Sequence, residues 1–260
     1  MATEFYNRNW RMPKSSNSSK VSNYSMSFDG SSEFIDIGTG TSLPTGADAY
    51  TISLWVNTNS QTKIPMFFRG ELGANKMVLL AYKPNNIVVA HYGNDNNFPF
   101  TLTNGVWFNI VLVHSATATE LYVNSVSQGS FTTGSLSLTD ASTFIGKYGF
   151  SGYDFWDGKL DHVAIFDYAL SSSQITELYG NSTDGVGNPM ALNPKPVAYY
   201  PIGDKAAFNG SEYLVTNAAS EVYSPYALNF DAASSDYIDL GGDSSLFPTS
   251  QLTASIWVKA

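Results

Sequence analysis

The sequence predicts an all-β protein, a sandwich of two antiparallel sheets with one short helix. From Tyr24 onward, runs of β-branched and aromatic residues recur about every ten positions, separated by Gly, Asn, Asp and Ser, which is the spacing of a β-sandwich. Several runs, such as 106–113, are apolar on both parities, as expected of strands in the middle of a sandwich. The hydrophobic share of 43% is ample for a packed core.

Ten runs are expected to be strands, and turn residues mark their ends. The pairs Asn104-Gly105 and Asp157-Gly158 tolerate positive φ or close a tight turn, so the chain folds back at these points. The predicted strands are 24–28, 33–37, 50–57, 63–69, 76–82, 86–91, 106–114, 119–124, 141–146 and 158–167.

One helix is expected after the last of these strands. Ser171 stands three residues before Gln174, the spacing of a capping box, and Gly180 can end the helix. Ile175 and Leu178 fall on one side. We therefore expect a short surface helix that packs through its apolar side.

Part of the sequence occurs twice. Phe28 and Trp55 reappear as Phe230 and Trp257, each 202 positions later, together with the residues around them. The period of a solenoid would be only about 20 to 50 residues, so we interpret the repeat as a duplicated domain. The predicted organisation is an arm (1–25), a complete sandwich (26–180), a linker (181–196) and the incomplete opening of a second copy (197–260). We expect the natural chain to continue past its last residue.

Composition excludes several classes of partner. The net charge of −9 and the pI near 4.6 argue against nucleic acid and anionic membrane surfaces, which need clustered Lys and Arg. The absence of Cys excludes disulfides and thiol chemistry. No run approaches the roughly 18 apolar residues of a membrane span, so we expect no membrane insertion.

Residues 1–25 are rich in Ser and Asn and show no periodicity. Two interpretations stay open: a disordered tail, or an arm that docks onto a partner chain. The second is favoured by Phe5, Tyr6 and Trp10, which would be unusual in a purely solvated tail.

Four regions of the sequence carry a resemblance to a known family. The region 144–175 reads as an apolar residue with Ile-Gly, then aromatic-x-Gly-x-apolar-Asp-x-Val-x-Ile, then a helix containing Ala-Leu-Ser. Together with 27–38, 50–56 and 105–113, it resembles a laminin-G-like domain of the concanavalin A-like lectin and glucanase superfamily. The resemblance implies a jelly-roll sandwich. It also identifies 197–204 as the family's first strand, which the first copy lacks.

Catalysis is not expected. Glycoside hydrolysis needs two carboxyl groups facing each other about 5 to 9.5 Å apart. The glucanases of this superfamily carry Glu-x-Asp-x-(x)-Glu, and no Glu of this chain has Asp two positions later. Glu33 and Asp36 are an odd number apart and point to opposite faces of a strand. We therefore predict no catalytic residue and no enzyme.

The resemblance implies calcium as a cofactor, which needs six to eight oxygen ligands. The candidate ligands are Asp29, Asp36, Asp157 and Asp161. The alternative is that Asp29 and Asp161 only cap turns.

The loop 148–155 is the best candidate for ligand binding. Sugars bind β-sandwiches through exposed aromatic planes beside polar groups, and this loop carries more rings than a solvated turn would. The alternative is that the rings bury against the core or a neighbouring subunit. The predicted binding residues are Tyr148, Phe150, Tyr153, Asp154 and Phe155.

A tandem laminin-G-like chain with a polar arm, no Cys and no signal peptide looks most similar to a bacteriophage virion protein, such as a decoration, fibre or tail-associated protein. We expect residues 1–25 to contact other virion subunits, the sandwich to contact host surface glycan, and the protein to be a homo-oligomer on virions assembled in the host cytoplasm. Two alternatives stay open: a structural decoration without ligand, and a bacterial cell-surface carbohydrate-binding protein.

Overall fold

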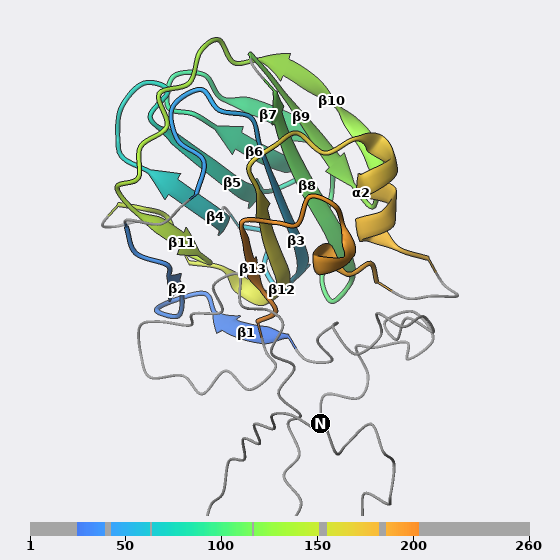
Figure 1. The fold of residues 1–260 in the computed structure, drawn as a ribbon. Helices are drawn as coiled ribbons and strands as arrows, with labels where there is room; N and C mark the ends of the chain where they lie inside the picture. Colours follow the sequence, from blue (N-terminus) through green and yellow to red (C-terminus); the bar gives the residue numbers. More distant parts are fainter. Residues whose placement is uncertain are drawn as a thin grey trace, which may run out of the picture. The chain divides into compact units, whose positions relative to one another are not determined.

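The computed structural model describes residues 25–39, 43–62, 64–115, 117–150, 155–181 and 186–202. Two antiparallel sheets lie face to face, and one helix covers part of an outer face (Figure 1). The predicted class, an all-β sandwich with one short helix, is confirmed.

The seven-stranded sheet has the order β1-β12-β3-β8-β9-β10, with β13 also paired to β12. Its strands are β1 (Met26–Asp29), β3 (Tyr50–Thr58), β8 (Trp107–Ser115), β9 (Ala118–Val123), β10 (Val126–Thr132), β12 (Asp157–Phe166) and β13 (Ala198–Tyr200). The six-stranded sheet has the order β2-β11-β4-β5-β6-β7. Its strands are β2 (Ile35–Asp36), β4 (Ile64–Gly70), β5 (Met77–Lys83), β6 (Asn86–Ala90), β7 (Asn96–Pro99) and β11 (Thr143–Ile145).

All ten predicted strands are present, but the sequence does not predict β7 or β10. Both lie at the outer edge of their sheets. Strand β10 is mostly exposed on both faces, and Val126 at its start is 62% exposed. Strand β10 has no fully buried residue, so it lacks the alternation of buried apolar residues by which a strand is recognised.

Strand β8 has apolar residues at both odd and even positions because both of its faces are buried. Ile110 and Leu112 face the core between the sheets, whereas Val111 and Val113 belong to a cluster on the outer face. This second cluster also contains Ile175 and Leu178 of helix α2 (Ser172–Tyr179). The helix therefore covers part of the outer face of the seven-stranded sheet.

The predicted capping box of α2 is present. The Ser171 hydroxyl accepts the Gln174 backbone N–H at 3.3 Å, and the Gln174 side chain accepts the Ser171 backbone N–H at 3.0 Å. Gly180 ends the helix with a φ of 78°, a conformation that glycine adopts without strain.

The segment 197–202, expected to open the second copy, instead belongs to the first sandwich. Strand β13 pairs antiparallel with Val163–Ile165 of β12. Because β1 pairs only with 157–160, the rest of β12 would be a bare edge without β13. The ring of Tyr199 stacks on His162 at 5.8 Å between centroids, and its hydroxyl lies 2.5 Å from Nδ1 of that histidine. The edge that the first copy was expected to leave open is therefore closed by β13.

The predicted linker also differs from expectation. Part of it forms the 3-10 helix η2 (Pro189–Ala191), and Leu192 is buried in the same outer cluster as α2. The rest of the predicted second copy, from residue 203 onward, and residues 1–24 of the predicted arm lie outside the described residues.

Replacing Tyr199 tests whether β13 is an integral strand. We expect Tyr199→Ala to lower the free energy of unfolding by about 3 kcal/mol, because it removes a buried ring. Tyr199→Phe should cost only about 1 kcal/mol, the value of one hydrogen bond. Urea unfolding of the full chain measures both. Tyr92→Ala, at a tyrosine that is 44% exposed, is the control. A Tyr199→Ala protein as stable as this control would show that β13 contributes nothing to the fold.

Candidate functional site

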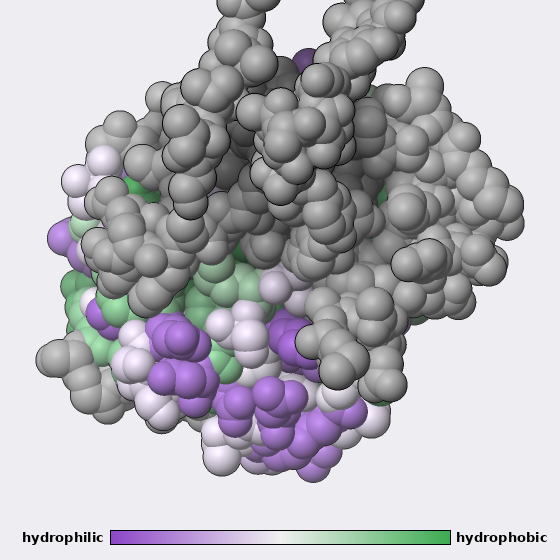
Figure 2. Space-filling view, turned by 90° about the horizontal axis from the view of Figure 1, so that it is seen from below, coloured by the Kyte–Doolittle hydropathy of each residue, from purple (hydrophilic) through white to green (hydrophobic). Residues whose placement is uncertain are grey.

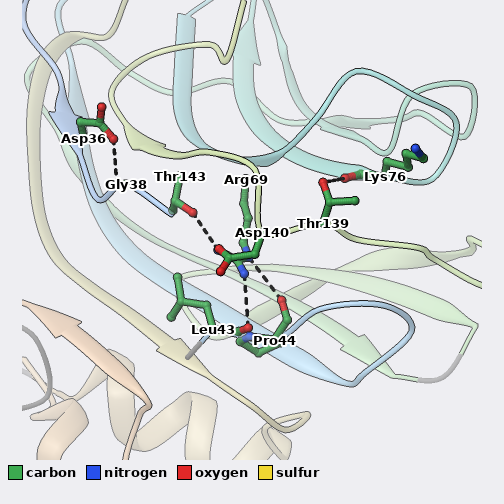
Figure 3. Close-up of polar contacts among 9 residues, drawn as sticks. All are labelled: Asp36, Gly38, Leu43, Pro44, Arg69, Lys76, Thr139, Asp140 and Thr143. Atoms are coloured by element: carbon green, nitrogen blue, oxygen red, sulfur yellow. Dashed lines mark hydrogen bonds and ion pairs between the residues drawn. The ribbon is translucent and has the colours of Figure 1, made fainter. Parts of the chain in front are cut away.

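A buried arginine organises one end of the six-stranded sheet (Figure 3). Arg69 of β4 is 2% exposed. Its Nη1 lies 3.0 Å from Oδ1 of Asp140 and donates to the Thr143 hydroxyl at 2.8 Å. Nη2 and Nε donate to the carbonyl oxygens of Leu43 and Pro44, each at 3.2 Å. One guanidinium therefore joins β4 to two segments that are distant in the sequence.

The charge of Arg69 makes these contacts obligatory. Burial lowers the pKa of Arg69, while the charge of Asp140 and its hydrogen bond raise it again. A buried guanidinium needs both an opposite charge and acceptors for its N–H groups. Thr143 is the first residue of β11, so the start of that strand is held at a defined place beside β4.

The residue before Arg69 points to the outer face and anchors a group of aromatic rings. Phe68 is fully buried in a separate apolar cluster on the outer face of the six-stranded sheet, with Met77 and Leu79 of β5. The rings of Tyr148 and Phe150 pack edge-on against it, with centroids at 5.6 and 5.3 Å, and Phe144 lies at 6.2 Å. Tyr148 and Phe150 also contact each other at 5.2 Å. All but Phe68 remain partly exposed.

Phe144 joins these rings to a second group. Its ring contacts Phe34 edge-on at 5.7 Å, and Phe34 lies 6.1 Å from Phe155. The ammonium of Lys147 lies over the same three rings. We call this surface the aromatic belt, and its members are Phe34, Phe68, Phe144, Lys147, Tyr148, Phe150 and Phe155.

The backbone at the base of the belt is paired on both sides. Lys147 and Phe155 form an antiparallel bridge, and the Trp156 N–H donates to the Gly146 carbonyl at 2.8 Å. Gly149 lies so close to Phe68 that a Cβ would come within 2.0 Å of its ring. Only glycine allows this approach, which lets the loop press directly on the anchor ring.

The space-filling view shows apolar surface beside strongly polar surface on the lower face of the described part (Figure 2). Strands β1, β2 and β11 lie toward this end in Figure 1. Exposed apolar surface rimmed by polar groups is typical of binding surfaces.

Three of the predicted binding residues, Tyr148, Phe150 and Phe155, lie in the aromatic belt. Tyr153 and Asp154 lie outside the described residues. The described rings of the loop pack on Phe68 or Phe34 and are partly exposed, so both interpretations of the loop stay open. Sequence reasoning missed Phe34, Phe144 and Lys147, since nothing local shows that they come together.

The four predicted metal ligands do not come together as one set. Asp29 accepts the backbone N–H groups of Ser31 and Ser32 at 2.8 Å and of Glu33 at 3.1 Å. Its other oxygen accepts the Ser32 hydroxyl at 2.9 Å. These hydrogen bonds hold the pKa of Asp29 well below its usual range. The carboxylate therefore caps a turn, which is the alternative considered from the sequence.

The other candidates have separate roles. Asp36, in the six-stranded sheet, accepts the Gly38 N–H at 2.8 Å. Asp161 is fully buried and accepts the His162 N–H at 2.7 Å. Only Asp157 is brought opposite Asp29, as its register partner. Within the described ranges no group of three or more His, Cys, Asp or Glu is placed to hold a metal ion, so the four predicted ligands do not form one site.

Two histidines lie close together inside the sandwich: His91, directly after β6, and His114 of β8. The rings of His91 and His114 lie 6.3 Å apart, and both side chains are buried. Burial lowers the pKa of His91 to about 4, with a smaller contribution from the charge of His114. His91 is therefore neutral near pH 7, bonded to the Tyr50 hydroxyl at 3.2 Å. It belongs to the core and has no access to a ligand.

The double-sheet jelly roll is an architecture that occurs in lectin domains, among others. The chain belongs to the Laminin_G_3 family of the concanavalin A-like lectin/glucanases superfamily, whose model matches residues 29–176. No curated protein sequence matches the chain. Among the helices of the described part, none is long and apolar enough to cross a membrane.

Solved structures share the fold at low sequence identity. A candidate carbohydrate-binding protein from Bacteroides ovatus has a TM-score of 0.54 at 18% identity, covering 73% of this chain and 54% of that one. The CBM40 of the Ruminococcus gnavus IT-sialidase has a TM-score of 0.50 at 11% identity, covering 62% and 99%. Domain 4 of the arabinanase AbnA from Geobacillus stearothermophilus, in complex with arabinotriose, reaches 0.49 at 20% identity, covering 60% and 76%.

Removing the charge of Asp140 tests the arginine contact. We expect Asp140→Asn to lower the free energy of unfolding by about 1 to 3 kcal/mol, because Arg69 keeps its charge and loses its counterion. The cost should fall below that of a fully buried pair, since the Asp140 side chain is 25% exposed. Urea unfolding measures the change, and Arg69→Met completes a double-mutant cycle. A coupling energy near zero would contradict the assignment.

Proposed function

We propose that the protein is a non-enzymatic, lectin-like domain that binds carbohydrate at the aromatic belt. One observation carries the proposal: the rings of Tyr148 and Phe150 are supported from below by the buried Phe68 and are partly exposed on their outer side. Rings held in this way lose little conformational freedom when a ligand packs on them.

The chemistry of the belt suits a sugar. A pyranose or furanose presents C–H groups on one face and hydroxyls around its rim, so it needs an apolar plane beside polar groups. The belt supplies several such planes, and Lys147 supplies a donor among them. The Bacteroides ovatus relative, which shares the fold, supports this choice of ligand by analogy only.

Substitution of Tyr148 tests the proposal. A glycan array probed with the full chain identifies ligands, and titration calorimetry on the best of them gives Kd. We expect Tyr148→Ala to weaken binding about tenfold through loss of ring contact. Tyr92→Ala, at an exposed tyrosine of another loop, should leave Kd unchanged. Loss of binding with Tyr92→Ala but not with Tyr148→Ala would place the site elsewhere.

If the array yields no ligand and no sugar binds at millimolar concentration, the protein is better explained as a structural decoration without ligand.

Titration of the same ligand with added calcium and with a chelator tests the calcium prediction. We expect no change in Kd, because the Asp29 carboxylate is already occupied by its own turn.

We further propose that this domain acts on the surface of a bacteriophage virion, where residues 1–25 contact other subunits of a homo-oligomer. A chain free of Cys and a repeated domain after a polar arm support this interpretation. Immunogold electron microscopy with antibodies to the full chain tests it. We expect label on virus particles from the source culture. Label confined to bacterial cell surfaces would instead support a cell-surface carbohydrate-binding protein.

A further inference from the structure

Lys147 is the charged member of the aromatic belt, and its ammonium is held by rings from three separate segments. The Nζ atom lies 4.0 Å from the ring centroid of Phe34, 4.9 Å from that of Phe144 and 6.0 Å from that of Phe155. These distances are those of cation–π contacts. The lysine backbone is fixed as well, through its bridge to Phe155. The ammonium of Lys147 is therefore held at a defined position.

The rings attract the ammonium but do not neutralise it. Within the part of the chain that the structure describes, the ion pairs of the basic side chains join Arg69 to Asp140 and Lys76 to Glu71, and neither pair includes Lys147. An ammonium has three N–H donors, and ring faces supply no oxygen acceptor. Lys147 is partly exposed, so donors remain available on its solvent side.

A fixed cation among rings favours an anionic ligand, most of all in a protein with a net charge of −9. The acidic surface elsewhere repels anions, so an anion that binds must do so at a local positive charge. A sugar that carries a carboxylate satisfies both features of the belt. Its C–H face packs on the rings, while its carboxylate accepts hydrogen bonds from Nζ.

We propose that the ligand of the belt is an acidic sugar whose carboxylate is bound by Lys147. This inference rests on the proposed carbohydrate-binding function and adds the class of sugar. Lys147 selects sugars that carry a carboxylate, whereas the rings of Tyr148 and Phe150 can pack on any sugar, charged or neutral.

Matched pairs of ligands test the charge alone. The full chain is titrated with oligomers of galacturonic, glucuronic and mannuronic acid, and with the methyl ester of each, which removes the charge and keeps the sugar. We expect at least one acid to bind about tenfold more tightly than its ester, the value of a charge-assisted hydrogen bond. Added salt should reduce this preference.

Variants of Lys147 assign the effect to that residue. Lys147→Met should bind acid and ester equally, whereas Lys147→Arg should retain the preference for the acid. Lys195→Met, at an exposed lysine before β13, is the matched control and should behave as the wild type. Thermal melting of each variant verifies that the sandwich is intact.

Two outcomes would overturn the inference, and they differ in what else they remove. Equal binding of acids and esters, or binding of neutral array sugars only, with Tyr148→Ala still weakening it, would leave the proposed function standing without charge selection. No binding of any sugar would remove both. A preference for the acid that survives in Lys147→Met would assign the charge contact to another residue.

Discussion

The contact between the Arg69 guanidinium and its acceptors is the constraint on which this end of the sandwich depends. Burying a charge away from water lowers the stability of the fold by several kcal/mol unless the charge is paired and hydrogen-bonded. Asp140 provides the counterion, while Thr143 and the carbonyl oxygens of Leu43 and Pro44 provide acceptors. Satisfying one side chain therefore places two segments, 43–44 and 140–143 at the start of β11, relative to β4.

The alternation of a β-strand carries this order to the outer surface. Phe68 and Arg69 are neighbours in β4 and point to opposite faces. The arginine holds Thr143 on the inside, and Phe68 meets the adjacent Phe144 on the outside. The rings of the aromatic belt are thus positioned by a charge on the other side of the same sheet. A surface built on strands in this way is less variable in position than one carried by a loop alone.

The sequence predicts the structure best where the pattern that specifies an element is local. The capping box at Ser171, the apolar side of α2 and the core strands were all predictable, because each depends on residues within one turn or one strand. Strand β10 was not, because an exposed edge strand has no apolar alternation. The assignment of 197–202 to a second copy followed its resemblance to a first strand. Sequence alone cannot show which bare edge such a strand will cover, and here it is that of β12.

The sequence by itself determined the class of fold, the position of the helix and the aromatic character of the loop at 148–155, since periodicity, caps and composition are written along the chain. Only the tertiary structure decided that the Asp29 carboxylate accepts the N–H groups of its own turn. It also decided that the Lys147 ammonium lies over the rings of Phe34 and Phe144. The physical reason is that hydrogen-bond saturation and ring contacts depend on distances across strands. These distances follow from the register and packing of the two sheets, which no local segment specifies.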